Sequence, residues 1–234
     1  MVMDFAAFPG NLERVRERIE SIQGREGLRG DVRLVAVTKG HDQSAVVAAQ
    51  AAGVLDVGEN RVQEAVGKQE VLERLPVKWH LIGHLQTNKA KYVPGRFALV
   101  HSIDSLRLAD ALQRVMESRG GELEPQPVLV QVNVADEPQK TGCDPQELNE
   151  IAARVSELSR LDFRGLMTMA PLTEDEKEQR RVFATLRRLR DDLSSSGLDL
   201  PELSMGMSGD YEAAVAEGAT ILRLGTVLFG ERPK

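Results

Sequence analysis

Short apolar segments alternate with helix-like segments along the whole chain, and this alternation restricts the fold more than any other feature. The apolar runs have the length and composition of buried strands, and eight can be counted: residues 32–38, 54–58, 78–83, 97–101, 127–134, 163–169, 201–206 and 220–224. Helix-like segments lie between them, near residues 42–52, 60–74, 86–92, 104–119, 145–159, 174–195 and 210–217. A further helix precedes the first strand, with apolar residues at helical spacing: Leu12, Val15, Ile19 and Ile22.

This order predicts a closed parallel (β/α)₈ barrel of the TIM type, because strands covered on both faces are short and continuously apolar. A doubly wound open sheet is the alternative. The turn after the first strand, TKGHDQS at residues 38–44, contains one glycine where a dinucleotide site needs three. No linker or change of composition divides the chain. We therefore expect an α/β protein with a single TIM-barrel domain over residues 1–234 and an extra N-terminal helix.

The balance of charges bears on the partners of the chain. It contains 30 Lys and Arg residues against 36 Asp and Glu residues, which gives a formal net charge of −6 at pH 7. An acidic protein repels polyanions, so we expect no nucleic-acid partner. A local basic pocket for one phosphate group is compatible with this composition.

The single cysteine, Cys143, excludes an intramolecular disulfide and a cysteine-based metal cluster, and it indicates a reducing compartment. It lies in the polar segment KTGCDP without a neighbouring base, so we do not interpret it as a nucleophile. The N-terminal MVMDFAAFPGN lacks the pattern of a signal peptide, and no apolar run reaches the roughly 18 residues of a membrane span. These features predict a cytoplasmic protein without a membrane partner.

The first predicted strand delivers a lysine, Lys39, to its carboxyl end. Successive side chains of a strand point to opposite faces, so Val35, Val37 and Lys39 share one face. A lysine at a strand end is most often a solvated surface group. In a (β/α)₈ barrel, however, this end carries the active site, so we expect Lys39 to point into the mouth of the barrel.

The eighth predicted strand, TILRL, places Ile221 and Arg223 on one face. Closure of a barrel makes the first and eighth strands neighbours, which brings Lys39 and Arg223 into the same mouth. A nearby guanidinium destabilises an ammonium group. We therefore expect the pKa of Lys39 to fall and its neutral amine to become nucleophilic toward an aldehyde.

A phosphate cradle is predicted beside these two residues, because the loops after strands 7 and 8 bind phosphate in many barrels. Here these loops read MGMSGD and LGTVLFG. They offer the hydroxyls of Ser208 and Thr226, a close backbone approach at Gly225, and the N–H groups of the following helices. A ligand with an aldehyde, a ring nitrogen and a phosphate would meet Lys39, Arg223 and this cradle in turn. Those groups together predict pyridoxal 5′-phosphate.

Histidines and methionines elsewhere have simpler interpretations. The segment HLIGH at residues 80–84 lacks the glutamate of the zinc motif HExxH and has a glycine where a helix must run, so no metal site is predicted. We expect His80 and His84 to serve packing, a strand-end hydrogen bond or the ligand mouth, whereas His41 and His101 are isolated in the sequence. Four methionines are expected in the core or the pocket lining: Met167, Met169, Met205 and Met207.

Longer motifs make the chain resemble the pyridoxal phosphate homeostasis proteins, also called the YggS or PROSC family. They extend over almost the whole sequence: AVTKG, GENRVQE, KWHLIGHLQTNKAK, HSIDS, QVNVADEPQKTG, GLMTMAP, LSMGMSGDYEAAVAEGAT and RLGTVLFGER. The resemblance implies the fold of the N-terminal barrel of alanine racemase, with pyridoxal 5′-phosphate held as an internal aldimine on Lys39. It also implies contact of Arg223 with the ring nitrogen, a pocket position for Asn60, and phosphate contacts from Ser208, Gly225 and Thr226.

Two further positions concern transfer of the cofactor. A second lysine studied in the family corresponds to Lys140, for which a role in transfer is proposed. Many relatives also carry a lysine two positions after the Schiff-base residue, where this chain has His41. This departure argues against a transfer scheme that depends on such a neighbour.

Two functions from different classes fit this resemblance. The first is a non-catalytic carrier, which holds the cofactor reversibly, limits free aldehyde and supplies apoenzymes that depend on it. The second is an amino acid racemase, which needs a second base on the opposite face; in alanine racemase a C-terminal β-domain of the partner subunit supplies a tyrosine. Neither Tyr92 nor Tyr211 can be placed opposite Lys39, and the chain ends at Lys234 without such a domain. We therefore expect the carrier, as a monomer.

The chemistry expected of Arg223 also favours a carrier. A guanidinium does not readily give up its proton, so it leaves a ring nitrogen largely unprotonated and makes the ring a weaker electron sink, although racemases tolerate this. A class I aldolase, in which Lys39 attacks a phosphosugar ketone, is a third option. It lacks a nearby acid–base pair in the sequence.

Overall fold

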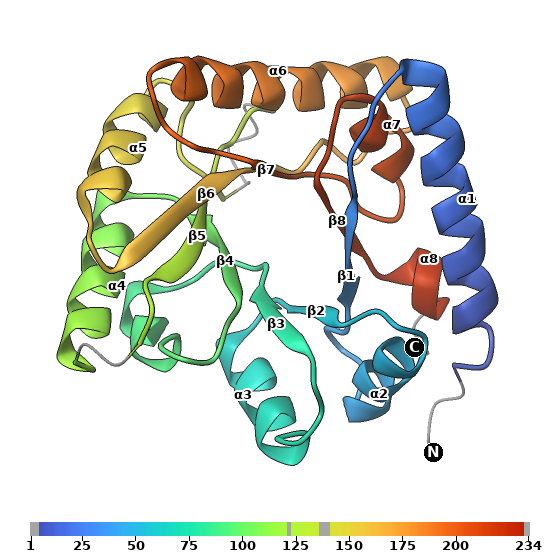
Figure 1. Ribbon diagram of the computed structural model, residues 1–234, viewed down its shortest axis with the longest axis horizontal. Helices are drawn as coiled ribbons and strands as arrows, with labels where there is room; N and C mark the ends of the chain where they lie inside the picture. The colour runs from blue at the N-terminus through green and yellow to red at the C-terminus, as the bar shows by residue number, and fades with distance from the viewer. Residues whose placement is uncertain (1–4, 121–122, 136–140, 232–234) are drawn as a thin grey trace.

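The computed structural model describes residues 5–120, 123–135 and 141–231. Within these ranges the strands form one closed ring, β1-β2-β3-β4-β5-β6-β7-β8, and every pairing is parallel. Figure 1 shows the helices arranged around the strands. The strands are β1 (Arg33–Val37), β2 (Asp56–Glu59), β3 (Lys78–Leu81), β4 (Leu99–Ile103), β5 (Gln126–Gln131), β6 (Leu161–Met167), β7 (Glu202–Ser204) and β8 (Ile221–Leu224). The predicted barrel is confirmed, and the open-sheet alternative is wrong.

A helical segment follows each strand, as the sequence predicted. The described helices are α1 (Phe8–Glu26), α2 (Gln43–Ala51), α3 (Val62–Val71), the 3₁₀ helix η1 (Thr87–Tyr92), α4 (Leu106–Ser118), α5 (Leu148–Glu157), α6 (Glu176–Ser195), α7 (Tyr211–Ala216) and α8 (Thr226–Phe229). Several begin where a side chain accepts an N–H: Asp42 caps α2, Ser105 caps α4 and Asp175 caps α6.

The structure shifts several of the expected boundaries by a few residues, and two of these changes concern β4 and the connection after β3. The fourth strand was expected at residues 97–101, and the structure places it at Leu99–Ile103; before it, the carbonyl of Phe97 accepts a hydrogen bond from the Gln126 side chain. The connection after β3 is a 3₁₀ helix of 6 residues, η1, rather than an α-helix. Short pieces of this kind are typical connectors.

Buried hydrophobic side chains fall into two groups that confirm the predicted alternation along the strands. The inner group fills the barrel, and its members are Val35, Val37, Ile82, Leu99, Leu129, Met167 and Ile221. The outer group lies between strands and helices and includes Ala36, Val57, Leu222 and Leu224. Odd-numbered residues of β1 and β8 therefore face the barrel axis, which directs Arg223 inward.

The extra helix α1 lies alongside α7 and α8, so the first helix packs against the last two (Figure 1). Its apolar side is buried at the predicted positions, including Leu12, Val15 and Ile19. The rings of Phe8 and Phe229 lie 4.8 Å apart, which ties the two ends of the described chain together. This packing covers the β1–β8 seam, where Lys39 and Arg223 were predicted to meet.

No helix within the described ranges is both long and apolar enough to cross a bilayer. The same residues bring together no group of three His, Cys, Asp or Glu side chains that could hold a metal ion.

Candidate functional site

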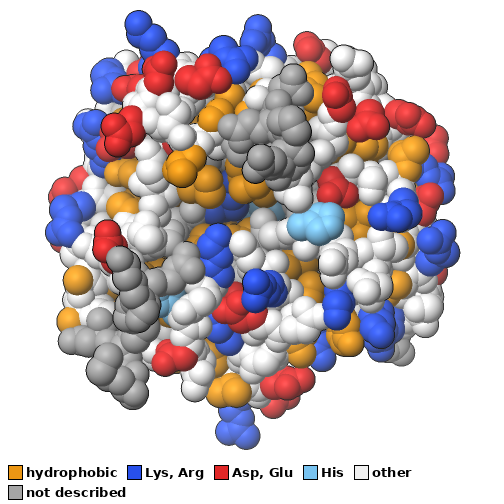
Figure 2. All heavy atoms as spheres, turned by 180° about the vertical axis from the view of Figure 1, so that it is seen from behind, with side chains coloured by type: hydrophobic (Ala, Val, Ile, Leu, Met, Phe, Trp, Pro, Cys, Tyr) orange, Lys and Arg blue, Asp and Glu red, His pale blue; other side chains and the backbone are white. Residues whose placement is uncertain are grey.

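A cavity of about 390 Å³ opens at the carboxyl ends of the strands. Its lining includes every binding residue expected from the sequence: Lys39, Asn60, Ser208, Arg223, Gly225 and Thr226. Hydrophobic side chains complete the walls, among them Val37, Ile82 and Met169. Figure 2 shows a hollow near the middle of one face, where basic and hydrophobic side chains meet. The fold thus gathers residues from both ends of the sequence into one small site.

Larger hollows exist, but their position in the barrel argues against a role as the functional site. One of about 830 Å³ lies at the other end of the barrel, where β3 and β5 begin, and its lining includes Lys78, Trp79 and Gln126. Sites in (β/α)₈ barrels lie at the carboxyl ends of the strands. The smaller cavity is therefore the better candidate, and a cationic side chain, Lys39, lines it just beyond the carboxyl end of a strand.

Lys39 follows β1 and is partly buried. The register of β1 against β8 explains the position of Lys39. Val35 lies opposite Arg223, and four residues later along β1 the chain reaches Lys39, beyond the carboxyl end of the strand. A Cβ atom built on Gly225 would lie 3.7 Å from that of Val37. Lys39, two residues beyond Val37 on the same face, is thereby directed into the cavity that Gly225 and Thr226 also line.

Charged side chains behind the cavity hold the turn that carries Lys39. The ammonium of Lys68 on α3 donates to the Thr38 carbonyl oxygen at 2.8 Å and to Glu59 Oε1 at 2.6 Å. Glu64 Oε1 accepts from the same ammonium at 3.1 Å and from the Gly40 N–H at 2.8 Å. The backbone is therefore anchored on both sides of Lys39.

Glu59 is fully buried, and burial raises the pKa of its carboxyl although Lys68 and Thr38 act in the opposite direction. Its second oxygen, Oε2, has no hydrogen-bond partner among the described residues. For Glu64, burial opposes ionisation, but the hydrogen bonds from Gly40 and Lys68 outweigh it and lower the pKa. Strand alternation does not reveal this cluster, because Glu59 shares the outer face of β2 with Val57 and Lys68 lies on a helix.

Arg223 is buried at the floor of the cavity. Its Nη1 donates to Ser204 Oγ at 2.7 Å and its Nη2 donates to the Thr168 carbonyl at 2.8 Å. Burial lowers the pKa of the guanidinium to about 10, against the attraction of Asp210. The group therefore stays charged near pH 7, with further N–H donors available because a guanidinium carries five.

The loops after β7 and β8 are joined through one hydroxyl. Ser208 Oγ accepts from the Gly225 N–H at 3.1 Å and from the Val227 N–H at 3.2 Å. Thr226 begins the short helix α8, and Gly225 and Thr226 line the cavity beside the Ser208 hydroxyl. Hydroxyl and backbone donors at this point suit a phosphate group.

Asn60 reaches the cavity because of a close contact between two loops. A Cβ atom built on Gly83 would lie 2.4 Å from the Asn60 carbonyl oxygen, so only glycine fits there. His84, which follows Gly83, also lines the cavity, and its Nδ1 lies 3.1 Å from Asp104 Oδ2. Gln131, the last residue of β5, also lines the cavity, whereas Asn133 is not among its described lining residues.

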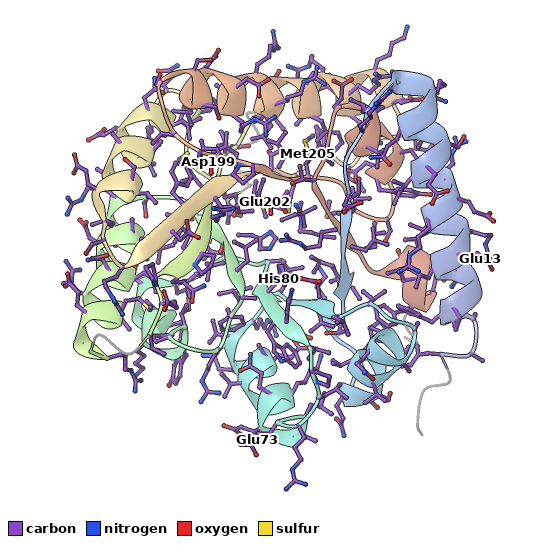
Figure 3. The ribbon with its side chains drawn as sticks, viewed as in Figure 1. Glu13, Glu73, His80, Asp199, Glu202 and Met205 are labelled. Carbon is purple, nitrogen blue, oxygen red and sulfur yellow. The ribbon has the colours of Figure 1, made fainter. Side chains whose placement is uncertain are left out.

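Histidine 101, which seemed isolated in the sequence, contacts His80 inside the barrel. His80 Nδ1 and His101 Nε2 lie 2.9 Å apart, and Figure 3 shows His80 projecting into the ring of strands. Alternation could have revealed the pair, because His80 shares its face with Ile82 and His101 shares its face with Leu99. Lys140, by contrast, lies outside the described residues.

Comparisons with known proteins agree on one family. The family model described as "Alanine racemase, N-terminal domain" matches residues 10–233. A pyridoxal phosphate homeostasis protein of Pseudomonas aeruginosa is 45% identical over 223 residues, which are 95% of this chain and 94% of the relative. One of Aquifex aeolicus is 43% identical over 94% of this chain and 96% of its own length.

Solved structures extend this similarity. The structure of PipY of Synechococcus elongatus with PLP bound superposes with a TM-score of 0.79 at 42% identity, covering 92% of this chain and 99% of PipY. An alanine racemase of Clostridium difficile has a TM-score of 0.74 at 18% identity, over 96% of this chain but 60% of the racemase. The racemase therefore shares the barrel fold alone.

Proposed function

The chain belongs to the family of pyridoxal phosphate homeostasis proteins, and we propose that it binds pyridoxal 5′-phosphate and limits the concentration of the free aldehyde without turning over a substrate. One observation carries this proposal: an amine, a guanidinium, the hydroxyl side chains of Ser208 and Thr226, and the Gly225 backbone line the same cavity. PipY, which is similar along 92% of this chain, has a structure with PLP bound.

The residues present fit this cofactor chemically. We propose that the Lys39 amine holds the aldehyde carbon as an internal aldimine, since a lysine amine is the group that attaches this cofactor in proteins. Arg223 would face the ring nitrogen, and Asn60 would lie beside the ring. Ser208, Gly225 and Thr226 would hold the phosphate. The cavity volume of about 390 Å³ lies within the range of small-molecule sites.

A charged arginine at the ring nitrogen supports holding rather than catalysis. The guanidinium keeps its proton near pH 7, because its pKa is about 10 even when buried. The ring nitrogen would stay unprotonated, and an unprotonated ring is a weaker electron sink. Racemases tolerate such an arginine, so we propose that the chain is a carrier and not an enzyme from this weaker electron sink together with the position of the two tyrosines.

An amino acid racemase is the alternative. It requires a second base that faces Lys39 across the ring, and neither Tyr92 nor Tyr211 is among the described residues that line the cavity. His84, paired with Asp104, is the lining side chain that could fill this role. The racemase reading therefore rests on one histidine at the cavity edge.

Reductive trapping tests the cofactor and its attachment together. Borohydride treatment of the protein loaded with pyridoxal phosphate, followed by peptide mapping, should label Lys39. The visible absorption band should vanish in Lys39→Ala and persist in Lys89→Ala, a matched change on η1. Label on another lysine, or a parent protein without a band, contradicts the proposal.

Incubation with single amino acid enantiomers separates the carrier from the racemase. Chiral chromatography after incubation of the loaded protein should show the starting enantiomer alone. Steady appearance of the opposite enantiomer, lost in His84→Ala, would establish the racemase instead.

We also propose that the chain works as a single domain and a monomer in the cytoplasm, and that it supplies the cofactor to apoenzymes. The single cysteine and the acidic composition support a reducing, cytoplasmic setting. Light scattering on the purified protein checks the monomer, and reactivation of an apo-transaminase by the loaded protein checks the supply of cofactor.

A further inference from the structure

A line of hydrogen-bonded side chains crosses the inside of the barrel from the cavity floor to the opposite end. Arg223 Nη1 contacts Ser204 Oγ at 2.7 Å, and Ser204 Oγ lies 2.8 Å from His101 Nδ1. His101 Nε2 lies 2.9 Å from His80 Nδ1. His80 Nε2 then lies 2.9 Å from Asp56 Oδ1, at the beginning of β2.

The line is shielded from water except at its far end. Exposure is at most 3% for four of its members: His80, His101, Ser204 and Arg223. The Asp56 side chain is 18% exposed. Polar groups in such an interior must satisfy one another, because an unpaired buried donor or acceptor is costly.

The direction of each hydrogen bond follows from the two ends. A guanidinium only donates, so Ser204 Oγ accepts from Arg223. Burial opposes ionisation of Asp56, but the hydrogen bond from His80 and nearby positive charges lower its pKa, so this carboxylate accepts. His80 Nε2 must therefore carry a proton.

The tautomers of both histidines can now be assigned. Burial holds the pKa of His101 well below its usual value, with the positive charge of Arg223 acting in the same direction, so its ring is neutral. With His80 also neutral, its Nδ1 accepts from His101 Nε2–H, and His101 Nδ1 accepts from the Ser204 hydroxyl. In this arrangement every hydrogen along the line has an acceptor. If His80 were cationic, the Ser204 hydroxyl hydrogen would lack an acceptor among the described residues.

We infer that His80 and His101 are positioning residues that hold Arg223 through a one-way series of donated hydrogen bonds ending on the Asp56 carboxylate. The inference rests on the proposed function, in which Arg223 faces the ring nitrogen. Each donor in such a series polarises the next, so the carboxylate at one end strengthens the contact at the other. Ser204 is thereby committed to accept from Arg223, which fixes the guanidinium plane toward the cavity.

Nuclear magnetic resonance of the ligand-free protein tests the assigned tautomers without any cofactor. In protein labelled with nitrogen-15 at histidine, both His80 and His101 should appear as neutral rings with the proton on Nε2 at pH 7. A proton on Nδ1 of either ring, or a cationic His80, overturns the inference whatever the fate of the proposed function.

Substitution of Asp56 tests the coupling from the far end of the barrel. Asp56→Asn keeps an acceptor for His80 but removes the charge. In the loaded protein, the nitrogen-15 resonance of the ring nitrogen of bound pyridoxal phosphate should therefore shift. Glu202→Gln is the matched control, because Glu202 is a partly buried carboxylate at the beginning of β7, ion-paired with Arg33 and outside the line (Figure 3). Equal resonances in the parent and Asp56→Asn contradict the coupling.

Substitution of His101 supplies a rescue experiment. His101→Leu interrupts the line, and the dissociation constant for pyridoxal phosphate should rise about tenfold, equivalent to about 1.4 kcal/mol. His101→Gln can accept from Ser204 and donate to His80, so it should bind within about threefold of the parent. If the parent binds pyridoxal phosphate, and His101→Leu and His101→Gln bind it with the same affinity as each other, the inference fails. If the parent itself shows no visible band, the proposed function fails instead.

Discussion

The Nζ atom of Lys68 lies 2.8 Å from the carbonyl oxygen of Thr38, the residue directly before Lys39. A side chain on α3 thus holds the main chain just after β1, directly before the candidate attachment residue. The same ammonium neutralises Glu59, which is fully buried. Packing of α3 and the position of Lys39 are therefore linked through one cation.

Removal of that cation should destabilise the protein strongly. Lys68→Met leaves Glu59 buried without an opposite charge, and we expect the free energy of unfolding to fall by about 3–5 kcal/mol. Urea denaturation measures this, with Lys78→Met at the exposed start of β3 as the control. Adding Glu59→Gln to Lys68→Met should recover part of the loss. A double variant that is less stable than Lys68→Met contradicts the explanation.

Gly83 should tolerate no side chain. In Gly83→Ala the new methyl group would meet the Asn60 carbonyl at 2.4 Å, so the Asn60 loop must shift. We expect a loss of about 1–3 kcal/mol in unfolding free energy together with weaker cofactor binding. Gly67→Ala is the control, because Gly67 lies within α3 with no atom near its added methyl, and it should gain about 0.5–1 kcal/mol. Equal stability of both variants would disprove the contact.

The cap of α2 should make part of the stability depend on pH. Asp42 accepts from the Ser44 N–H at 2.9 Å, and hydrogen bonds from the Ser44 side chain and backbone lower its pKa. A lowered pKa means that this contribution is complete above the unfolded value near 4 and is lost as the pH falls through the folded value.

Asp42→Ala should therefore cost about 1 kcal/mol at pH 7, and the difference from the parent should shrink as the pH falls below about 4. Urea denaturation at several pH values measures it. Asp42→Asn, which keeps an acceptor for the cap, should retain most of the stability without the acid dependence. A cost that stays constant down to pH 3 would rule out the carboxylate as its source.

The thiol of Cys143 should be inert in the folded protein. Burial raises its pKa to about 12, with nearby carboxylates acting in the same direction. At pH 8 the thiolate is scarcely populated, so Ellman's reagent should react slowly with native protein and rapidly after unfolding in urea. Because it is the only cysteine of the sequence, the signal needs no deconvolution. Fast reaction of the native protein would contradict the burial of this residue.

Strand periodicity predicted those parts of the site that project along the barrel axis. The alternation in β1 and β8 correctly placed Val35, Val37 and Ile221 inside, and Lys39 and Arg223 followed from the same count. The proximity of Lys39 and Arg223 requires a closed ring of strands, and the eight apolar runs predicted such a ring. Local sequence was enough here because a strand has a fixed repeat of two residues.

Contacts between elements could not be predicted in this way. Lys68 looks like an ordinary surface lysine of an amphipathic helix, and only the packing of α3 on β2 shows that it meets Glu59. His101 looks isolated in the sequence because its partner lies 21 positions earlier, on the preceding strand. Both contacts depend on which elements are neighbours in the fold and on how far the side chains extend. The sequence of a single segment contains neither kind of information.

The parallel pairing of β1 with β8 makes the order of synthesis matter. Arg223 joins the growing polypeptide 184 residues after Lys39 (223 minus 39). A nascent chain on the ribosome therefore exposes the amine long before it possesses the guanidinium and the donors of Gly225 and Thr226. Under the proposed function, capture of an aldehyde ligand by the finished pocket would thus follow translation, because the amine of an unfinished chain lacks the selectivity that the closed ring would confer.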